Sequence, residues 1–279
     1  MASPQIALSP QITAEASHRV ATESRSINLL LLAGVVIALG AIILGFVCTG
    51  TSLSYFFQPT GVSIVLGGTL GVTLVTTPRN ALINSLRRVA GLIKATEVNR
   101  EVLIEEIVHY ARVARRGGAL ALEPLLHKIG HPFLREALQL AADINNRQEL
   151  QAVLETGLHT AERQGEADAR ALEIAAGYAP TLGIIGTVVG LIDVLRQFSN
   201  LEKVGFGVGT AFVSTIYGLA LANLLLLPAA HRIRASVSET FEIQELMLEG
   251  VLGIVDAVHP ALLQIRLNAF LRARVRNAA

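Results

Sequence analysis

The sequence predicts an all-α, polytopic membrane protein with four transmembrane helices and a helical cytoplasmic domain between helices two and three. Its composition is the first reason: 52% of the 279 residues are hydrophobic and 16% are charged, against about 25% charged in a typical soluble domain. The second reason is the placement of charge. Asp, Glu, Lys, Arg and His are absent from residues 27–78, 174–192 and 204–230. A charged stretch separates the first two blocks, as expected for spans around an inserted polar domain.

The uncharged blocks divide into four predicted spans. A transmembrane helix needs about 20 apolar residues, so we place the spans at 28–48, 61–78, 178–198 and 206–229. The second span is short, and its three glycines suit close helix packing; a buried re-entrant helix is the alternative. The first span follows a long segment of mixed charge without a clear cleavage site, so we interpret it as retained and not as a signal peptide.

Basic residues set the predicted orientation, because Lys and Arg near span ends mark the cytoplasmic side. The loop between spans one and two has no basic residue, and the loop between spans three and four has only Arg196 and Lys203. Both termini and the central domain are therefore predicted to be cytoplasmic. The basic residues that flank spans on that side are Arg19, Arg25, Arg79, Arg87, Arg88, Lys94, Arg232 and Arg234.

This orientation divides the chain into five predicted regions. They are a cytoplasmic N-terminal segment (1–26), spans one and two (27–78), the cytoplasmic helical domain (79–175), spans three and four (176–230) and cytoplasmic C-terminal helices (231–279).

Helical spacing of apolar residues predicts the elements of the cytoplasmic domain. One helix ends at Gly117 and Gly118, a short helix follows, and a third begins near Pro132. The next helix carries charge up to about residue 173 and then continues into span three without a breaker before Gly177. We therefore expect one long helix that leaves the membrane.

Motifs of enzymes and cofactor sites are nearly absent. The glycines of residues 205–210 (GFGVGT) lack the Lys-Ser/Thr of a phosphate loop, so we interpret them as a flexible start to span four. His127 and His131 have a spacing found in some metal sites, but a glycine and a proline interrupt any helix there and we assign no metal. The single cysteine, Cys48, cannot form an internal disulfide. A net charge of +1 gives no reason to invoke nucleic acid. We predict that the chain is not an enzyme and holds no cofactor.

Polar residues inside the predicted spans are the stronger functional signal. Thr187 lies near the middle of span three, and Thr215 lies within about two turns of the middle of span four. Packing alone explains each of them, since Thr bonds carbonyls of its own helix. As a pair on adjacent spans they could instead offer oxygens to a passing cation. No acid or base lies deep in any span, so the titratable group of an ion path must come from another chain.

Three further residues have both a packing explanation and a functional one. Asp193 lies near the outer end of span three, where it can pair with Arg196 one turn away or attract cations to the mouth of an ion path. Pro180 and Pro228 lie near the cytoplasmic ends of spans three and four. A proline kinks or starts a helix, and two at matching depth also suit a lever that transmits motion to the cytoplasmic helices.

Several separated motifs, in the same order, resemble the MotA/TolQ/ExbB family. Two of them resemble the family's two-helix core, and three resemble the second span and the cytoplasmic segments of its MotA-type stators. TolQ and ExbB have three spans and no domain between spans two and three, so the predicted arrangement indicates the MotA branch. The resemblance covers roughly residues 28–265, and its motifs lie at 177–195 and 207–233 for the core and at 60–78, 111–123 and 131–143 for the rest.

The resemblance implies a stator subunit of the bacterial flagellar motor in the inner membrane. In this family a homopentamer surrounds two helices of a MotB-type partner, which brings the ion-carrying aspartate and anchors to peptidoglycan. Spans three and four would then form the core of an H⁺ or Na⁺ channel. The absence of an acid from the spans of this chain fits that division of labour.

Matching motifs also imply roles for single residues. Arg115 and Glu123 match the Arg and Glu that contact the rotor (C-ring) protein, although solvated charges are the plain alternative. Pro180 and Pro228 match the paired prolines that couple ion passage to movement. Thr215 matches the hydroxyl that faces the aspartate of the partner.

Two residues bear on the ion. Thr187 favours sodium, because sodium-driven members tend to have Thr at this place and many proton-driven members have Ala. Asp193 departs from the family, in which His or another uncharged residue is usual there.

Two other functions fit the sequence. One is a non-flagellar, TolQ/ExbB-like energiser that couples ion flow to another envelope process, which a neighbouring gene for a TonB-like partner would favour. The other is a structural membrane scaffold, for which Thr187→Ala and Thr215→Ala should alter only stability.

Overall fold

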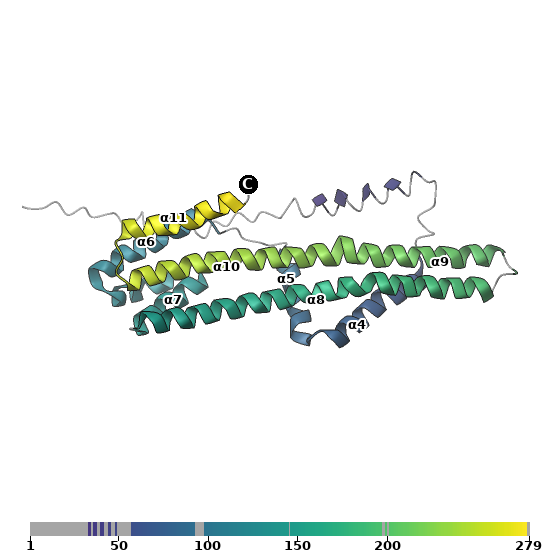
Figure 1. Ribbon diagram of the computed structural model, residues 1–279, viewed down its shortest axis with the longest axis horizontal. Coiled ribbons are helices and arrows are strands. Elements are labelled where there is room, and N and C mark those ends of the chain that lie inside the picture. The colour runs from purple at the N-terminus through teal and green to yellow at the C-terminus, as the bar shows by residue number, and fades with distance from the viewer. Residues whose placement is uncertain are drawn as a thin grey trace, which may run out of the picture. The chain divides into compact units, whose positions relative to one another are not determined.

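A computed structural model describes residues 57–92, 98–144, 146–196, 199 and 201–277, with isolated positions between 33 and 48. Every regular element in these ranges is a helix, so the predicted all-α class is confirmed. The N-terminal segment 1–26 and most of the first predicted span lie outside the described residues. The helices are α3 (Pro59–Val62), η2 (Ser63–Gly67), α4 (Gly68–Thr76), α5 (Arg79–Leu92), α6 (Arg100–Gly117), η3 (Ala119–Lys128), α7 (Pro132–Asp143), α8 (Arg147–Arg196), α9 (Leu201–Ala220), η4 (Leu221–Leu226), α10 (Leu227–Val255) and α11 (Pro260–Asn277) (Figure 1).

Three helices in the described part of the chain are long and apolar enough to cross a membrane. They are Pro59–Thr76, Arg147–Arg196 and the continuous stretch Val204–Val255. These helices contain the second, third and fourth predicted spans, or most of them. The first of the three is 18 residues long, which is at the lower limit for a span.

The long helix that the sequence predicts is α8, with 50 residues. Asn146 precedes it, and the Asn146 side chain accepts a hydrogen bond from the Gln148 amide at 3.0 Å. This bond satisfies one of the amides that has no partner within the helix. Pro180 lies inside α8 and does not interrupt it. The structure therefore excludes a helix start at Pro180.

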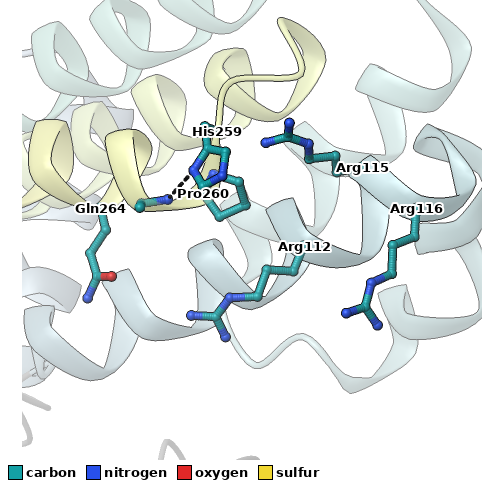
Figure 2. A pocket seen from close by; sticks show the side chains of 7 residues that line it. Arg112, Arg115, Arg116, His259, Pro260 and Gln264 are labelled. Carbon is teal, nitrogen blue, oxygen red and sulfur yellow. Dashed lines mark hydrogen bonds between the residues drawn. The ribbon is translucent and has the colours of Figure 1, made fainter. Parts of the chain in front are cut away.

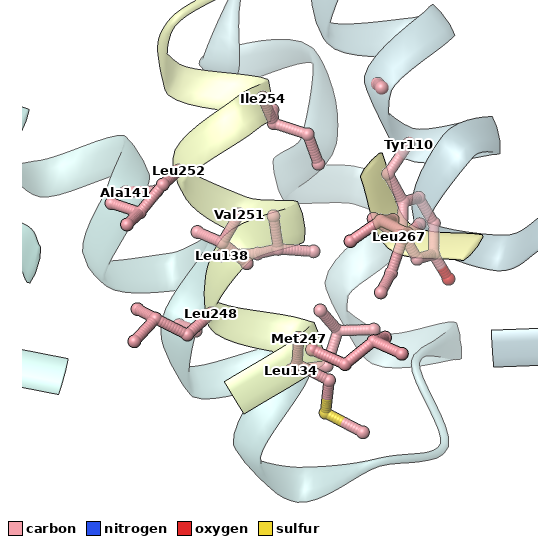
Figure 3. Close-up of a cluster of buried hydrophobic side chains, with 14 of the residues drawn as sticks. Tyr110, Leu134, Leu138, Ala141, Met247, Leu248, Val251, Leu252, Ile254 and Leu267 are labelled. Atoms are coloured by element: carbon pink, nitrogen blue, oxygen red, sulfur yellow. The ribbon is translucent and has the colours of Figure 1, made fainter. Parts of the chain in front are cut away.

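The described chain forms two compact units. Unit 1 contains residues 96–162 and 238–279, and its core is built from large aliphatic side chains of α6, α7, the first part of α8, the second part of α10, and α11. Leu134 and Leu138 of α7 are fully buried there with Met247 and Val251 of α10 (Figure 3). Burying one such side chain stabilises a fold by about 1.5–3 kcal/mol. The C-terminal helices thus share a core with the segment before span three.

A glycine at a helix end and two ion pairs help to fix the helices of unit 1. α6 ends at Gly118, which has a φ of +76° that glycine adopts without strain. Arg100, which is 8% exposed, donates to the Glu242 carboxylate at 2.8 Å. Arg147 pairs with Asp256 at the same distance.

Unit 2 contains residues 26–95 and 163–237, which include α3 to α5, the second part of α8, α9 and the first part of α10. α8 and α9 lie side by side in it, and the chain reverses between them (Figure 1). α5 is attached to α8 by an ion pair of Arg88 with Asp168 at 2.8 Å, in which the Asp168 side chain is 2% exposed. Val89 and Leu92 of α5 pack against a small cluster of buried residues of α8 and α10.

The structure corrects one expectation for the start of span four. Residues 205–210 (GFGVGT) are helical and belong to α9, whereas the sequence suggested a flexible segment. The cause is contact with α8. A methyl group at Gly207 would lie 2.7 Å from the Val194 side chain, so this glycine serves close packing and not flexibility.

Candidate functional site

Spans three and four pack through their smallest residues. A methyl group at Gly218 would lie 2.5 Å from the Ala179 carbonyl oxygen, and one at Gly190 would lie 2.8 Å from the Ala211 amide nitrogen. At Gly183 the nearest atom would be the Ser214 carbonyl oxygen, at 3.0 Å. The two backbones therefore touch along at least three turns, as is common between membrane helices with small residues at their interface.

This close approach brings the two predicted threonines together. The hydroxyl oxygens of Thr187 and Thr215 are 2.5 Å apart. The Thr187 hydroxyl is also 3.1 Å from the Gly183 carbonyl and 3.0 Å from the Ala211 carbonyl. One hydroxyl proton cannot serve three acceptors at once. Three oxygens, two of them carbonyls and one a hydroxyl, therefore surround the Thr187 hydroxyl between α8 and α9, and the four oxygens form one cluster.

The chemistry of this oxygen cluster suits a cation or a proton relay. Oxygen atoms, carbonyl oxygens among them, are the ligands that hard cations prefer, and hydroxyls both donate and accept hydrogen bonds. Both threonines are half-buried, so each keeps part of its surface accessible to another molecule. No charged residue lies within residues 174–192 or 204–230. The cluster therefore has oxygens but no titratable acid.

The two prolines have different effects on their helices. Pro180 is part of a continuous α-helix and lies beside Gly218 of α9. Pro228 follows the π-helix η4, in which the Leu227 amide bonds to the Ala222 carbonyl, five residues earlier. Because proline cannot donate to the preceding turn, a widened turn is the expected local response. Span four therefore carries a π-helical turn directly before Pro228, whereas span three has none at Pro180.

Asp193 is half-buried near the end of α8. The sequence suggested an ion pair with Arg196, which stays a prediction. Arg196 is exposed at the last position of the helix.

Arg115 lines a cavity of about 530 Å³ in unit 1. Figure 2 shows three arginines of α6, Arg112, Arg115 and Arg116, on one side of it and the start of α11 on the other. The Ala261 amide donates to His259 Nδ1 at 3.3 Å. The Nε2 of a neutral His259 therefore carries the proton and is a donor. Among the described residues none of the three guanidiniums has a hydrogen-bond or ion-pair partner, so the cavity presents donors and positive charge.

Glu123 is not part of this cavity. It lies on η3 with an exposed side chain, and η3 packs against α6 and α7. Within the described ranges Glu123 forms no ion pair. The structure therefore places the two predicted rotor-contact residues on consecutive helices, with the positive residue in a concave surface and the negative one on an exposed helix.

Sequence reasoning did not single out a second group of polar residues in unit 2. Gln58, Thr210 and Ser214 are 3%, 6% and 0% exposed, and the Thr210 hydroxyl donates to the Gln58 side-chain oxygen. A recognisable signal existed, because Thr210 and Ser214 are four residues apart on the predicted span four. Gln58 directly precedes Pro59, where a span begins.

Two families match most of the chain in consecutive segments. The motility protein A N-terminal family matches residues 32–117, and the MotA/TolQ/ExbB proton channel family matches residues 126–245. The chain belongs to the MotA/TolQ/ExbB proton channel family. The match to the N-terminal family places it in the motility protein A branch, as the sequence motifs predict.

Curated relatives and solved structures agree with this family. Motility protein A of Bacillus subtilis (strain 168) is 28% identical over 250 residues, which cover 88% of this chain and 91% of the relative. The flagellar MotAB stator complex from Bacillus subtilis contains a chain with a TM-score of 0.80 and 28% identity, covering 88% of this chain and 97% of that one. The structure of C. jejuni MotAB, at 24% identity, has the same fold with a TM-score of 0.82 over 87% of this chain and 95% of that one.

The family match includes most of the candidate site. The matched segments contain Arg115, Thr187, Thr215 and both prolines, whereas Glu123 falls in the gap between residues 117 and 126. The apolar helices and the family together identify this MotA/TolQ/ExbB protein as a membrane protein.

Proposed function

We infer that this chain is a stator subunit of the bacterial flagellar motor, which forms an ion channel with a MotB-type partner and couples ion flow to rotor torque. The observation that carries this inference is the oxygen cluster at Thr187 and Thr215, which lies between two closely packed apolar helices and contains no acid. Such a cluster needs an ion-carrying carboxylate from elsewhere. A partner helix with an aspartate supplies that group.

The chain crosses the inner membrane four times with both termini in the cytoplasm. The distribution of Lys and Arg supports this orientation, and the division of the chain into spans and cytoplasmic regions follows the boundaries predicted from charge. Large apolar side chains remain exposed on spans three and four of the single chain, among them Ile184, Val188, Leu195 and Phe212. Lipid, neighbouring copies in a homopentamer and the partner helices cover these faces.

Thr215 faces the aspartate of the partner, and Thr187 supports Thr215 through the 2.5 Å contact between their hydroxyls. The transported ion is Na⁺ or H⁺, and the hydroxyl and carbonyl oxygens around Thr187 favour Na⁺. Asp193, near the outer end of span three, attracts cations to the path. The π-helical turn before Pro228 and the proline within α8 supply the points at which spans three and four transmit movement.

The rotor contact is made by the exposed surfaces of unit 1. Arg115 lies in a cavity lined by three guanidiniums that have no ion-pair partner in the described part of the chain. Such a cavity attracts carboxylates, and Glu123 is an exposed carboxylate on the next helix. A C-ring protein with an acidic group for the cavity and a basic group for Glu123 fits this pair.

The decisive experiment expresses this chain with its MotB-type partner in a strain that lacks stators and measures rotation of tethered cells. Speed is recorded against external sodium at fixed pH, and then in sodium buffer with a protonophore. For a sodium stator, speed rises with sodium and briefly survives the protonophore, and Thr187→Ala raises the sodium concentration for half-maximal speed. A rotation speed that does not depend on sodium and falls to zero with the protonophore indicates a proton stator. A pair that assembles in the membrane but never restores rotation contradicts the flagellar function and leaves the non-flagellar energiser.

A second arm of the same experiment tests the rotor contact. Arg115→Glu should abolish rotation while the complex remains in the membrane and conducts its ion, because only docking to the rotor changes. Arg170→Glu is the matched control, since Arg170 is exposed on α8 outside the cavity. Equal rotation by the Arg115 and Arg170 variants would exclude the cavity as the rotor contact.

A further inference from the structure

We propose that Gln58, the residue directly before span two, is a positioning residue for the oxygen cluster at Thr187 and Thr215. It acts by holding α9 in one rotational orientation about the helix axis. The proposal concerns a residue outside spans three and four and rests on the proposed function only where it predicts motor behaviour.

The first observation is that the Gln58 side chain is buried and bonded to span four. Gln58 is 3% exposed and Thr210 is 6% exposed, and the Thr210 hydroxyl donates to Gln58 Oε1. A residue before a helix ordinarily caps that helix with its side chain. Gln58 makes no such bond to α3. Its side-chain oxygen instead accepts from a different helix.

A second contact and a close approach fix the same face of α9. The backbone amide nitrogen of Gln58 donates a long hydrogen bond to the Tyr217 hydroxyl, with 3.5 Å between the two atoms. Between these two points, a methyl group at Gly61 of α3 would lie 2.6 Å from the Ser214 hydroxyl oxygen. Thr210, Ser214 and Tyr217 are spaced by four and three residues and therefore lie on one face of α9. The start of span two contacts that face along two turns.

The adjacent face of α9 carries the oxygen cluster. Ala211, Thr215 and Gly218 each follow a residue of the first face by one position, which is a rotation of about 100° around the helix. The Ala211 carbonyl and the Thr215 hydroxyl contact Thr187, and Gly218 contacts α8 at Ala179. α9 is thus held between α3 and α8. Any rotation that releases Thr210 from Gln58 also turns Thr215 away from Thr187.

The glycines at the α8–α9 contact cannot set this rotation by themselves. They allow two backbones to approach, but they carry no side chain that selects one angle. A hydrogen bond between a buried side-chain amide and a buried hydroxyl is directional. Without it, the Thr210 hydroxyl keeps only the Phe206 carbonyl of its own helix, 3.1 Å away, and this polar tie between Gln58 and α9 is lost. Gln58 with Thr210 is therefore suited to select the angle that the small residues leave open.

Cross-linking tests the rotation of α9 without reference to motor function. The whole chain with its partner, in membranes and with Cys48→Ser, carries Thr187→Cys and Thr215→Cys. A disulfide forms readily only when the two Cβ atoms are about 3.8 Å apart, so its rate of formation reports the alignment. Gln58→Met has nearly the same length and no strong acceptor, and Thr210→Val removes the donor. Each should slow cross-linking by about three- to tenfold.

Three further variants distinguish a specific effect on the orientation of α9 from a general loss of folding. Gln58→Glu, in the protonated form that burial favours, keeps an acceptor oxygen at the same reach and should retain the rate. The double variant Gln58→Met with Thr210→Val should be no slower than either single change, because both remove one interaction. Ser63→Ala is the control, since the Ser63 hydroxyl is exposed and, among the described residues, bonds only the Pro59 carbonyl of its own helix. Wild-type rates for both Gln58→Met and Thr210→Val, at equal amounts of membrane protein, would overturn the proposal.

Single-motor recordings then test the link to the ion path, in chains that keep both threonines. A merely structural role of Gln58 would lower the number of working stators and leave the speed of each unchanged. We expect Gln58→Met to change the concentration of the driving ion for half-maximal speed of one stator by about three- to tenfold, with Gln58→Glu restoring it. If the wild-type pair does not rotate but cross-linking follows the expected pattern, the motor function fails and the positioning role stands. If the wild-type pair rotates and Gln58→Met leaves the ion dependence of each stator unchanged, the proposed link to the ion path is wrong.

Discussion

The core of unit 1 and the α8–α9 contact of unit 2 are built from side chains of different size. In unit 1 the buried residues are mostly Leu, Ile, Val and Met from α6, α7, α8, α10 and α11. At the α8–α9 contact of unit 2, Gly183, Gly190 and Gly218 meet backbone atoms of the facing helix. Both regions are helix–helix packing in one chain, so the difference does not come from secondary structure.

The difference follows from the solvent expected around each region. In water, large apolar side chains stabilise a fold because their burial removes surface from water. Inside a membrane that driving force is absent, and helices associate through close van der Waals contact and hydrogen bonds, for which small residues are best. A change in side-chain size should therefore affect stability in opposite ways in the two regions. Smaller side chains should destabilise unit 1, and larger side chains should destabilise the α8–α9 contact.

The largest effect is expected for removing volume from unit 1. Leu138→Ala deletes a side chain that is 1% exposed and should lower the free energy of unfolding by about 3 kcal/mol. Thermal or denaturant unfolding of the purified complex measures it. Leu262→Ala is the same substitution at a residue that is 48% exposed, and it should change stability by less than about 0.5 kcal/mol. Equal losses for the two variants would contradict the assignment of this core.

A somewhat smaller effect is expected for adding volume at the contact of spans three and four. Gly218→Ala places a methyl group 2.5 Å from a backbone oxygen of α8 and should destabilise the complex by about 2 kcal/mol, although alanine favours helix formation. The assay is heat stability of the complex in detergent, together with rotation. Gly71→Ala is the control in α4, where no atom of this chain lies within 4 Å of the added group. A Gly218→Ala variant that is more stable than wild type would mean that α8 and α9 can move apart without loss of stability.

The smallest effect concerns pH and should be confined to unit 1, since the α8–α9 contact has no titratable group deep in it. Burial lowers the pKa of His131, whose Nδ1 has no hydrogen-bond partner among the described residues. The unfolded chain then binds a proton at His131 more readily than the folded chain. The contribution of His131 to stability is therefore constant above about pH 6.5 and falls as the pH drops below it. Melting temperatures at pH 7.5 and 5.5 should differ less for His131→Gln than for wild type. His127→Gln, at an exposed position, should leave the difference unchanged.

Much of the candidate site could be predicted from the sequence, because its parts are local. The lack of charge in residues 174–192 and 204–230, the threonines within them and the two prolines are all visible without a structure. Spacing also predicted the helices of unit 1 and the long α8. The partners of Gln58 and Asp168 were not predictable, nor was the cavity that the three α6 arginines line. Gln58 and Thr210 are 152 positions apart in the chain, and no local pattern states which face of one helix meets which face of another.

The sequence by itself determined which segments are apolar and helical, and that any acid deep in the membrane must come from a partner, because these depend on composition and on neighbours a few residues away. Only the tertiary structure decided that residues on both sides of spans three and four share the core of unit 1. It also decided that the hydroxyls of Thr187 and Thr215 form a hydrogen bond with each other and that Gln58, directly before span two, contacts span four. The physical reason is that such contacts depend on how close two helices approach and at what angle. Small residues permit the approach, and directional hydrogen bonds select the angle.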